Sequence, residues 1–485
     1  MAWPRKWIAL PILLGVLCTV YCMVLLLRFG VLDDYSFLYD FHYRPRGLFG
    51  SLASQGRPLN ELLLWVAFSS VRKLRDLWEI RLANLVVLAG MAWLYFLAMN
   101  RAGWKRGSLC FVVILCTVPA ITFFAAQASA FPIAVSGLCA VAAGLLATHA
   151  FSTNEGRWSL SVMSGFLLLI STIAYQPTAM LFWPTIALDL FPRADNAASK
   201  RALCRFGQYA CIALPALFAG WIVYKWGVHE FPKVVSAERN GFVVAYGDKL
   251  RWFFREPAVD VFSFPGLRPS PIRAVVVAFL LVPGLLLYFG KAGRAANIFL
   301  AIILLPLAYL PNLLTKTDWA TYRTQAGFCW TAIFLAWLAA HGYWRLGRRI
   351  INNDQLPDVL LLLATAWCCA IAAWHVTDFI AWPQSVELAI LKTALADPRM
   401  AAAQRIIVLQ PRGTDTPAPF SRYDEFGVPS VSQWTPKFQI ALIQLENDSH
   451  ARLIPVESRD VSHADDPIPP GSEVIDMRIL PDLRQ

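Results

Sequence analysis

The feature that most limits the possible folds of this chain is a series of apolar blocks. Each block is long enough to cross or nearly cross a lipid bilayer. A bilayer core requires about 20 apolar residues in helical conformation, and the first block, Ile8 to Leu27, meets this length. Hydrophobic residues make up 57% of the 485 residues and charged residues only 15%, which is more apolar surface than a soluble fold can bury. We therefore expect an all-α polytopic membrane protein.

Eleven blocks qualify as transmembrane helices. The first follows Arg5 and Lys6, and we interpret it as an uncleaved anchor because it is long and no small-residue cleavage site follows it. Several of the others are short, so flanking Trp, Tyr or polar residues must complete their ends. These ten blocks are Leu82–Met99, Leu109–Phe124, Ile133–Thr148, Leu160–Ala174, Thr178–Leu190, Tyr209–Val223, Ala274–Phe289, Ile298–Leu310, Phe328–Ala340 and Val359–Trp374.

Lysine and arginine in the short loops predict the orientation, because cationic loops stay on the cytoplasmic side. An odd number of spans with a cytoplasmic amino terminus places the carboxy-terminal tail outside. The net charge of +11 is then mainly an orientation signal with attraction to anionic lipid, and it does not indicate nucleic acid. The basic loop residues are Arg101, Lys105, Arg106, Arg157, Arg193, Lys200, Arg201, Arg205, Lys291, Arg294, Arg345, Arg348 and Arg349.

The predicted architecture is a transmembrane domain over residues 1–376 and a small extracytoplasmic α/β domain over residues 377–485. The transmembrane domain carries two long outer loops, 28–81 and 226–273. The second of these is rich in Lys, Arg and aromatic residues, and we expect it to contain an amphipathic helix in the membrane interface around Trp252.

Composition changes in the carboxy-terminal tail, where Pro, Asp and Gly separate short apolar runs. We expect a helix near Ser385–Ala396 and a linker or turn region over Glu457–Gly471. Strands are predicted at Arg405–Gln410, Gln439–Leu445 and Val474–Leu480.

Two adjacent carboxylates, Asp33 and Asp34, follow the first span directly. Desolvation and mutual repulsion at a membrane surface raise the pKa of at least one carboxylate, which can then accept a proton near neutral pH. A hydroxyl group that attacks a carbon centre needs such a proton acceptor. The alternative is that the pair caps the next helix or stops the first span in place.

The same outer loop supplies the arginines Arg44, Arg46 and Arg57. A guanidinium group matches phosphate oxygens in a bidentate fork, so these side chains suit the phosphate of a lipid-phosphate molecule. Contact with ordinary lipid headgroups is the alternative interpretation, and it has more weight for Arg44 and Arg46 than for Arg57.

Four short motifs carry a resemblance to a known family. Asp33-Asp34-Tyr35 stands directly after the first span, and Gly56-Arg57-Pro58-Leu59 follows in the same loop. Ala174-Tyr175-Gln176 lies at the outer end of the fifth span, and the segment Asp318 to Arg323 lies in an outer turn. The chain resembles the bacterial and phage O-antigen glucosyltransferases of the GT-C class, loosely over its first three quarters and closely only in these motifs.

The resemblance implies a hexosyltransferase of the bacterial inner membrane. Such an enzyme moves a sugar, commonly glucose, from a polyprenyl-phosphate donor to an envelope glycan such as O-antigen on the extracytoplasmic, periplasmic side. Its acidic catalytic residues lie in the first outer loop, which indicates Asp34 or, failing that, Asp33 as the base. The physics of the residues is equally compatible with an arabinose or mannose donor.

The other expected site residues divide between the donor phosphate and the substrates. Asp318 stands where the family has a glutamate, and Tyr175 and Gln176 have an alternative interpretation as an interfacial tyrosine and a helix-capping amide. Arg57, Arg323, Arg44 and Arg46 are the expected phosphate ligands; Tyr35, Tyr175, Gln176, Asp318 and Tyr322 are the expected substrate contacts.

The sequence assigns no cofactor with certainty. A divalent metal that bridges the two acids and the phosphate is compatible with the residues, although no ligand spacing requires one. The expected partners are the lipid-linked donor, a glycan or lipid-linked acceptor and membrane lipid, with no nucleic acid.

A transporter or flippase for a lipid-linked saccharide is the main alternative, and a structural membrane protein is a third. Transport predicts charged residues within the spans along a path, whereas the apolar blocks here are almost free of charge.

Overall fold

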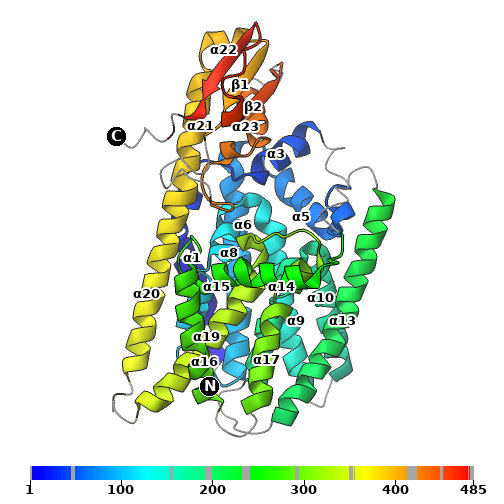
Figure 1. The fold of residues 1–485 in the computed structure, drawn as a ribbon, viewed down its shortest axis with the longest axis vertical. Helices are drawn as coiled ribbons and strands as arrows, with labels where there is room; N and C mark the ends of the chain where they lie inside the picture. The colour runs from blue at the N-terminus through cyan, green and yellow to red at the C-terminus, as the bar shows by residue number, and fades with distance from the viewer. Residues whose placement is uncertain are drawn as a thin grey trace.

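The computed structural model describes residues 3–44, 50–152, 157–191, 199–231, 241–289, 294–348, 353, 355–411, 423–447, 452–478 and 480. These residues are mostly helical, and every predicted apolar block falls mainly on helix (Figure 1). Six helical segments are long and apolar enough to cross a membrane, which is compatible with a polytopic membrane protein. They are Leu74–Arg101 (η2 and α6), Ala128–Ser152 (η3 and α9), Arg157–Ala174 (α10), Ala202–Glu230 (within α13, Ser199–Glu230), Pro271–Tyr288 (α16) and Leu356–Leu395 (α20, η5 and α21).

A seventh span forms if the bent pair α7 and α8 crosses as one unit. The two helices meet at 68°, and Pro119 begins the second of them, where a proline fits because the first helical position needs no N–H donor. Two apolar helices, Trp7–Val20 of α1 and Ala295–Leu307 of α17, are shorter. The total of eleven spans therefore stays a prediction.

The remaining elements connect, flank or cap these helices. They are α1 (Trp3–Val20), α2 (Cys22–Leu26), α3 (Asp33–Tyr43), η1 (Ala53–Gln55), α5 (Pro58–Ser69), α7 (Ser108–Leu115), α8 (Pro119–Ala126), α11 (Gln176–Ala179), α12 (Phe182–Leu190), α14 (Tyr246–Arg255), α15 (Pro257–Phe262), α17 (Arg294–Leu307), α18 (Leu310–Leu314), η4 (Tyr322–Thr324), α19 (Ala326–Gly347), α22 (Pro398–Ala402), η6 (Pro429–Val431), α23 (Thr435–Asn447) and η7 (Val461–His463).

A long helical rod connects the bundle to the tail. The rod consists of α20 (Leu356–Val376), the π-helical turn η5 (Thr377–Ala381) and α21 (Trp382–Leu395), which together make 40 residues. At 1.5 Å per residue it is about 60 Å long, roughly twice the thickness of a bilayer core. The rod therefore extends well beyond the bundle and carries the tail at one end (Figure 1).

The tail contains a three-stranded parallel sheet of order β2-β1-β3, formed by β1 (Arg405–Leu409), β2 (Val456–Arg459) and β3 (Ser472–Asp476). The strand predicted at Arg405–Gln410 is confirmed as β1, and the one predicted at Val474–Leu480 is confirmed only in part, because β3 begins at Ser472 and ends at Asp476. The predicted strand at Gln439–Leu445 is wrong, because these residues belong to helix α23.

Two interactions explain this outcome. The apolar side chains Ile440 and Ile443 are buried in the same core as β1, and their three-residue spacing places them on one helical face. Strand β2 lies in the predicted linker, where only pairing with β1 reveals it.

Helices α14 and α15 lie across the bundle within the second long loop (Figure 1). Tyr246, Leu250 and Phe254 follow each other at four-residue spacing and are all exposed, while Trp252 and Phe253 are buried. The predicted amphipathic helix of this loop is therefore present as α14.

Figure 1 shows the sheet at one end of the molecule and the beginning of α1 and α20 at the other. We call these the sheet end and the far end.

A prediction concerns the tight contact between α16 and α19. A Cβ atom on Gly342 would lie 2.1 Å from the Gly284 carbonyl oxygen, whereas a Cβ on Gly347 of the same helix meets nothing within 4 Å. We expect Gly342→Ala to destabilise the fold by about 1–3 kcal/mol through overpacking. Gly347→Ala, the matched control, should be neutral or gain up to about 1 kcal/mol from helix propensity. Thermal unfolding in detergent measures both, and equal melting temperatures would contradict the packing.

Candidate functional site

Asp34 is fully buried, and it contacts backbone N–H groups and Arg81, as expected of a residue that stabilises the fold. Its oxygens accept hydrogen bonds from the backbone N–H groups of Val31 (3.0 Å), Ala128 (3.1 Å) and Ser129 (2.7 Å). Arg81 lies 3.6 Å away and also donates to backbone carbonyl oxygens. Burial raises the pKa of Asp34, as predicted, against the lowering effect of Arg81 and the backbone donors. The carboxylate thereby holds the start of α3 against the turn at 128–129.

The adjacent residue, Asp33, lies in a different environment, which is partly open to solvent. Its side chain is 33% exposed, and its Oδ2 atom lies 3.2 Å from Arg323 Nη1. Arg323 also places its Nε atom 2.8 Å from Glu425 Oε1, and Glu425 is buried. One guanidinium thus connects the start of α3, the turn η4 and the tail.

Arg57 lies on the other side of the same cluster. Its Nε donates to Gln176 Oε1 at 2.8 Å, and its guanidinium stacks 4.6 Å from the centroid of the Tyr175 ring. Burial lowers the pKa of Arg57, and the neighbouring positive charge of Arg323 lowers it further, whereas Tyr175 opposes this shift. The described residues provide no carboxylate partner for Arg57, in contrast to Arg323.

The sequence Gly56-Arg57-Pro58 explains how Arg57 reaches this position. Gly56 has a φ of +76°, a left-handed conformation that glycine adopts without strain, and it ends the turn η1. A Cβ atom there would also lie 2.7 Å from Tyr224 Cβ. Pro58 then begins α5, so that Arg57 is fixed between a tight turn and a helix start. The Asn60 side chain donates to the Ala174 carbonyl oxygen at 3.0 Å and ties α5 to the end of α10.

A groove of about 200 Å³ leads away from Arg57 and Gln176. Its walls come from α10, α11, α13 and α18. Besides these two polar side chains its lining is largely apolar, and Trp221, Phe242 and Leu314 in it are also exposed at the surface of the bundle. The groove therefore joins a partly buried cation to an exposed apolar surface. Its other lining residues include Thr172, Leu217, Tyr224, Leu310 and Asn312.

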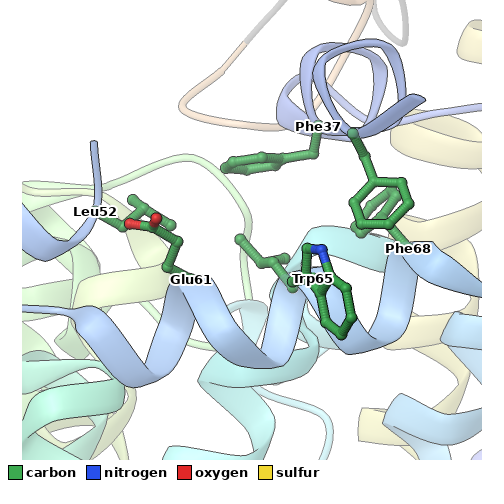
Figure 2. Close-up of a pocket in the computed structure, with 7 residues that line it drawn as sticks. Phe37, Leu52, Glu61, Trp65 and Phe68 are labelled. Atoms are coloured by element: carbon green, nitrogen blue, oxygen red, sulfur yellow. The ribbon is translucent and has the colours of Figure 1, made fainter. Parts of the chain in front are cut away.

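A smaller cavity lies between α3 and α5 near the turn η1 (Figure 2). Its volume of about 20 Å³ holds no more than a water-sized molecule. Glu61 at its edge accepts hydrogen bonds from the backbone N–H groups of Gly50 (2.8 Å) and Ala53 (3.1 Å). Glu61 therefore anchors the turn that precedes Arg57, and the cavity is a packing feature.

Five of the predicted site residues come together: Asp33, Arg57, Tyr175, Gln176 and Arg323. Tyr175 lies within electrostatic reach of both arginines and of Asp33. These residues come from α3, the start of α5, the α10–α11 break and η4, which are far apart in the sequence.

The other predicted residues lie elsewhere. Tyr35 is fully buried and its hydroxyl accepts from the Gly30 N–H at 3.1 Å, while the Tyr322 hydroxyl donates to the Leu267 carbonyl oxygen. Asp318 is exposed and pairs with Lys249 at 2.8 Å. Arg44 is exposed beside the Tyr39 ring. Arg46 lies outside the described residues.

Sequence reasoning missed the contribution of the tail, residues 423–426. Besides Glu425, Asp424 accepts a hydrogen bond from the Tyr322 N–H at 2.6 Å, and Asp424 has a φ of +54°. The only signal in the sequence is the acidic pair Asp424-Glu425 in the run Tyr423 to Gly427, which resembles an ordinary turn.

A second missed residue, Asp260 of α15, connects the same tail segment to the bundle. Its oxygens accept hydrogen bonds from Gln325 Nε2 at 3.0 Å and from the Tyr423 hydroxyl at 3.3 Å. Burial raises the pKa of Asp260 to about 6, the two hydrogen bonds oppose this shift, and Glu256 adds to it.

Among the described residues, no group of three or more His, Cys, Asp or Glu side chains is placed to hold a metal ion. The metal that was predicted as compatible with Asp33 and Asp34 stays a prediction. No protein-family model matches the chain, and no curated protein matches its sequence. Functional inference therefore depends on the geometry above.

The two adjacent aspartates should differ sharply in their effect on stability. We expect Asp34→Asn to destabilise the fold by about 3–5 kcal/mol, because Arg81 would remain buried without its carboxylate. The matched change Asp33→Asn should cost less than about 1 kcal/mol, since Asp33 is partly exposed. Thermal unfolding of the two variants in the same detergent measures the difference. Similar losses for both would contradict the structural role of Asp34.

The raised pKa of Asp260 predicts that the stability of the folded protein depends on pH. Because its pKa is raised in the folded state, the ionised carboxylate costs stability, and this cost appears as the pH rises through about 6. Asn cannot ionise, and Gln325 can rotate its amide to donate or accept. Asp260→Asn should therefore raise the melting temperature at pH 8 and change it less at pH 5. An effect that is equal at both pH values would show that the Asp260 pKa is not raised.

Proposed function

We propose that this chain is a GT-C-type glycosyltransferase that moves a sugar, with glucose as the first candidate, from a polyprenyl-phosphate donor to an envelope glycan such as O-antigen. The observation that carries this proposal is the environment of Arg57. This residue is a partly buried cation without a carboxylate partner among the described residues, and it lies at the head of an apolar groove. A partly desolvated charge of this kind is stabilised by an anionic ligand.

The groove and the cluster together match the chemistry of a lipid phosphate. The prenyl chain would lie along the exposed apolar residues Trp221, Phe242 and Leu314, and the phosphate would meet Arg57. Arg323 lies close enough to Arg57 to lower its pKa. Both guanidinium groups can therefore stabilise the negative charge that develops on the leaving phosphate.

Asp33 is the base in this proposal, in preference to Asp34. Arg323 contacts its Oδ2 atom, and the side chain is partly exposed, so Oδ1 can receive a hydroxyl proton. Asp34 uses its oxygens for backbone donors and Arg81.

The reaction is a direct displacement. The acceptor hydroxyl loses its proton to Asp33, and its oxygen forms a bond to the anomeric carbon. The bond from that carbon to the phosphate oxygen breaks, and the polyprenyl phosphate leaves with the electron pair. The anomeric centre is inverted because no covalent sugar–protein intermediate forms.

The proposed location is the bacterial inner membrane with the sheet end outside the cytoplasm. The far end carries Arg106, Arg157 and Arg345, which fits the preference of cationic loops for the cytoplasm.

Transfer is tested with membranes or purified protein, radiolabelled polyprenyl-phosphate sugars and an acceptor glycan. We expect Asp33→Asn to lower the transfer rate by roughly 10²–10⁴-fold, the usual contribution of a general base. Asp248→Asn, an exposed aspartate on α14, is the matched control and should retain full activity. Both proteins must be present in equal amounts and melt at similar temperatures.

Unchanged transfer by the Asp33 variant would remove this residue from the chemistry. Movement of intact labelled lipid across vesicle membranes, without release of the sugar, would instead support a transporter or flippase.

A further inference from the structure

One turn of the carboxy-terminal tail, residues 423–427, packs against the bundle, although the rest of the tail has a core of its own. Ile406 and Val408 of β1 are buried in a core that they share with α3, α5 and α23. Phe426, in contrast, is buried in the core of the bundle. We call residues 423–427 the tail turn.

The backbone gives the tail turn a fixed shape. The Tyr423 N–H donates to the Phe426 carbonyl oxygen at 3.1 Å, and the Phe426 N–H donates to the Tyr423 carbonyl oxygen at 3.0 Å. Asp424 and Gly427 both have positive φ angles, +54° and +105°, and Asp and Gly are among the residues that adopt this conformation most readily. The turn is therefore a closed loop whose two carboxylates lie at its tip.

These two carboxylates contact two consecutive residues of η4. Asp424 accepts a hydrogen bond from the Tyr322 N–H at 2.6 Å, and the Oε1 atom of Glu425 lies 2.8 Å from Arg323 Nε. The Phe426 ring packs edge-on against the Tyr322 ring, with the centroids 5.8 Å apart. The tail turn thus contacts both the backbone of η4 and the guanidinium group that η4 carries.

Other contacts fix the tail turn without any help from η4. The Gly427 N–H donates to the Phe379 carbonyl oxygen of η5 at 2.6 Å, and Gln384 Nε2 donates to the Gly427 carbonyl oxygen at 3.1 Å. The Tyr423 hydroxyl donates to Asp260 of α15 at 3.3 Å. Because the rod and α15 hold it, the turn can determine where the Arg323 guanidinium lies instead of following it.

The guanidinium group of Arg323 is held at two different nitrogens. Its Nε contacts Glu425, and its Nη1 lies 3.2 Å from Asp33 Oδ2. A guanidinium group is planar and rigid, so two contacts at separate nitrogens fix its orientation, whereas one contact leaves it free to turn. Glu425 is buried and Arg323 is only 23% exposed, so solvent screens this pair less than a surface pair.

We propose that Glu425 is a positioning residue for sugar transfer: it fixes Arg323, which in turn holds Asp33 with Oδ1 open to the acceptor hydroxyl. This inference rests on the proposed function. It makes the docked tail a requirement of the reaction. Glu425 also neutralises part of the Arg323 charge, which leaves Arg57 as the stronger attraction for the donor phosphate.

The test measures sugar transfer by purified Glu425→Gln. Glutamine keeps the shape of the side chain but removes its charge, so the contact with Arg323 weakens. We expect kcat to fall roughly 10- to 100-fold, the size of effect that misplacement of a reacting group produces. The KM for the polyprenyl-phosphate donor should fall as well, because Arg323 is then less neutralised and attracts the phosphate more strongly. Loss of folded protein would lower the apparent kcat but would not lower KM.

Two further variants control for charge and folding. Glu425→Asp keeps the charge on a shorter side chain, so it should restore the wild-type KM and recover part of kcat. Glu79→Gln, which changes an exposed glutamate on α6, should leave both parameters unchanged. If Glu425→Gln fails to fold, Glu425→Asp provides the test, since its kcat should lie below that of the wild type at an equal KM.

Two kinetic results would overturn the proposal. One is wild-type kcat and KM in folded Glu425→Gln. The other is a lower kcat with an unchanged or raised KM, which would give Glu425 a structural role alone.

Amide hydrogen exchange separates this inference from the proposed function. A wild type that transfers no sugar would reject the function but not the contact. Glu425→Gln should then still exchange faster than the wild type over η4, Tyr322–Thr324, while Glu79→Gln should not. Equal exchange over η4 in all three proteins would show that Glu425 does not position this turn.

Discussion

The sheet end of this molecule is held together by the guanidinium group of Arg323, which contacts Asp33 at 3.2 Å and Glu425 at 2.8 Å. These contacts join the start of α3, the turn η4 and the carboxy-terminal tail, so the tail is part of the cluster rather than an appendage. The rod α20–α21 leads the chain from the bundle to the tail as one long helical segment. A flexible linker would have to order itself each time the cluster forms, at an entropic cost for each residue.

The two arginines of the cluster have different electrostatic environments, and this difference separates their roles. Arg323 is already paired with two carboxylates, so in the proposed reaction it orients Asp33 and adds only the remainder of its charge to that of Arg57 at the leaving phosphate. Arg57 interacts with the Gln176 amide and the Tyr175 ring, neither of which carries a negative charge at neutral pH. The unneutralised charge, at the head of an apolar groove, is the feature that favours a lipid phosphate over a soluble sugar or a protein partner.

The sequence predicted the helical, membrane-type architecture because the apolar blocks are long and nearly free of charge. It also predicted much of the cluster, since Asp33, Arg57, Tyr175, Gln176 and Arg323 lie in recognisable short motifs. It ranked Asp34 ahead of Asp33 as the base, and our proposal reverses this order, because Asp34 is held by backbone donors at Ala128 and Ser129, almost 100 residues away, which the sequence does not reveal. Glu425 could not be identified from the sequence for the same reason. Its part in the cluster depends on the contact between the acidic turn of the tail and Arg323 of η4.

The most direct test of the central claim is to locate the lipid phosphate on the protein. A photoreactive polyprenyl phosphate, crosslinked to the purified protein and mapped by mass spectrometry, should label groove residues near Trp221 and Tyr224, and excess unmodified polyprenyl phosphate should prevent this labelling. Arg57→Gln should abolish the labelling, whereas Arg251→Gln should not. Labelling that is spread over the bundle, or unaffected by the loss of the Arg57 charge, would contradict the account.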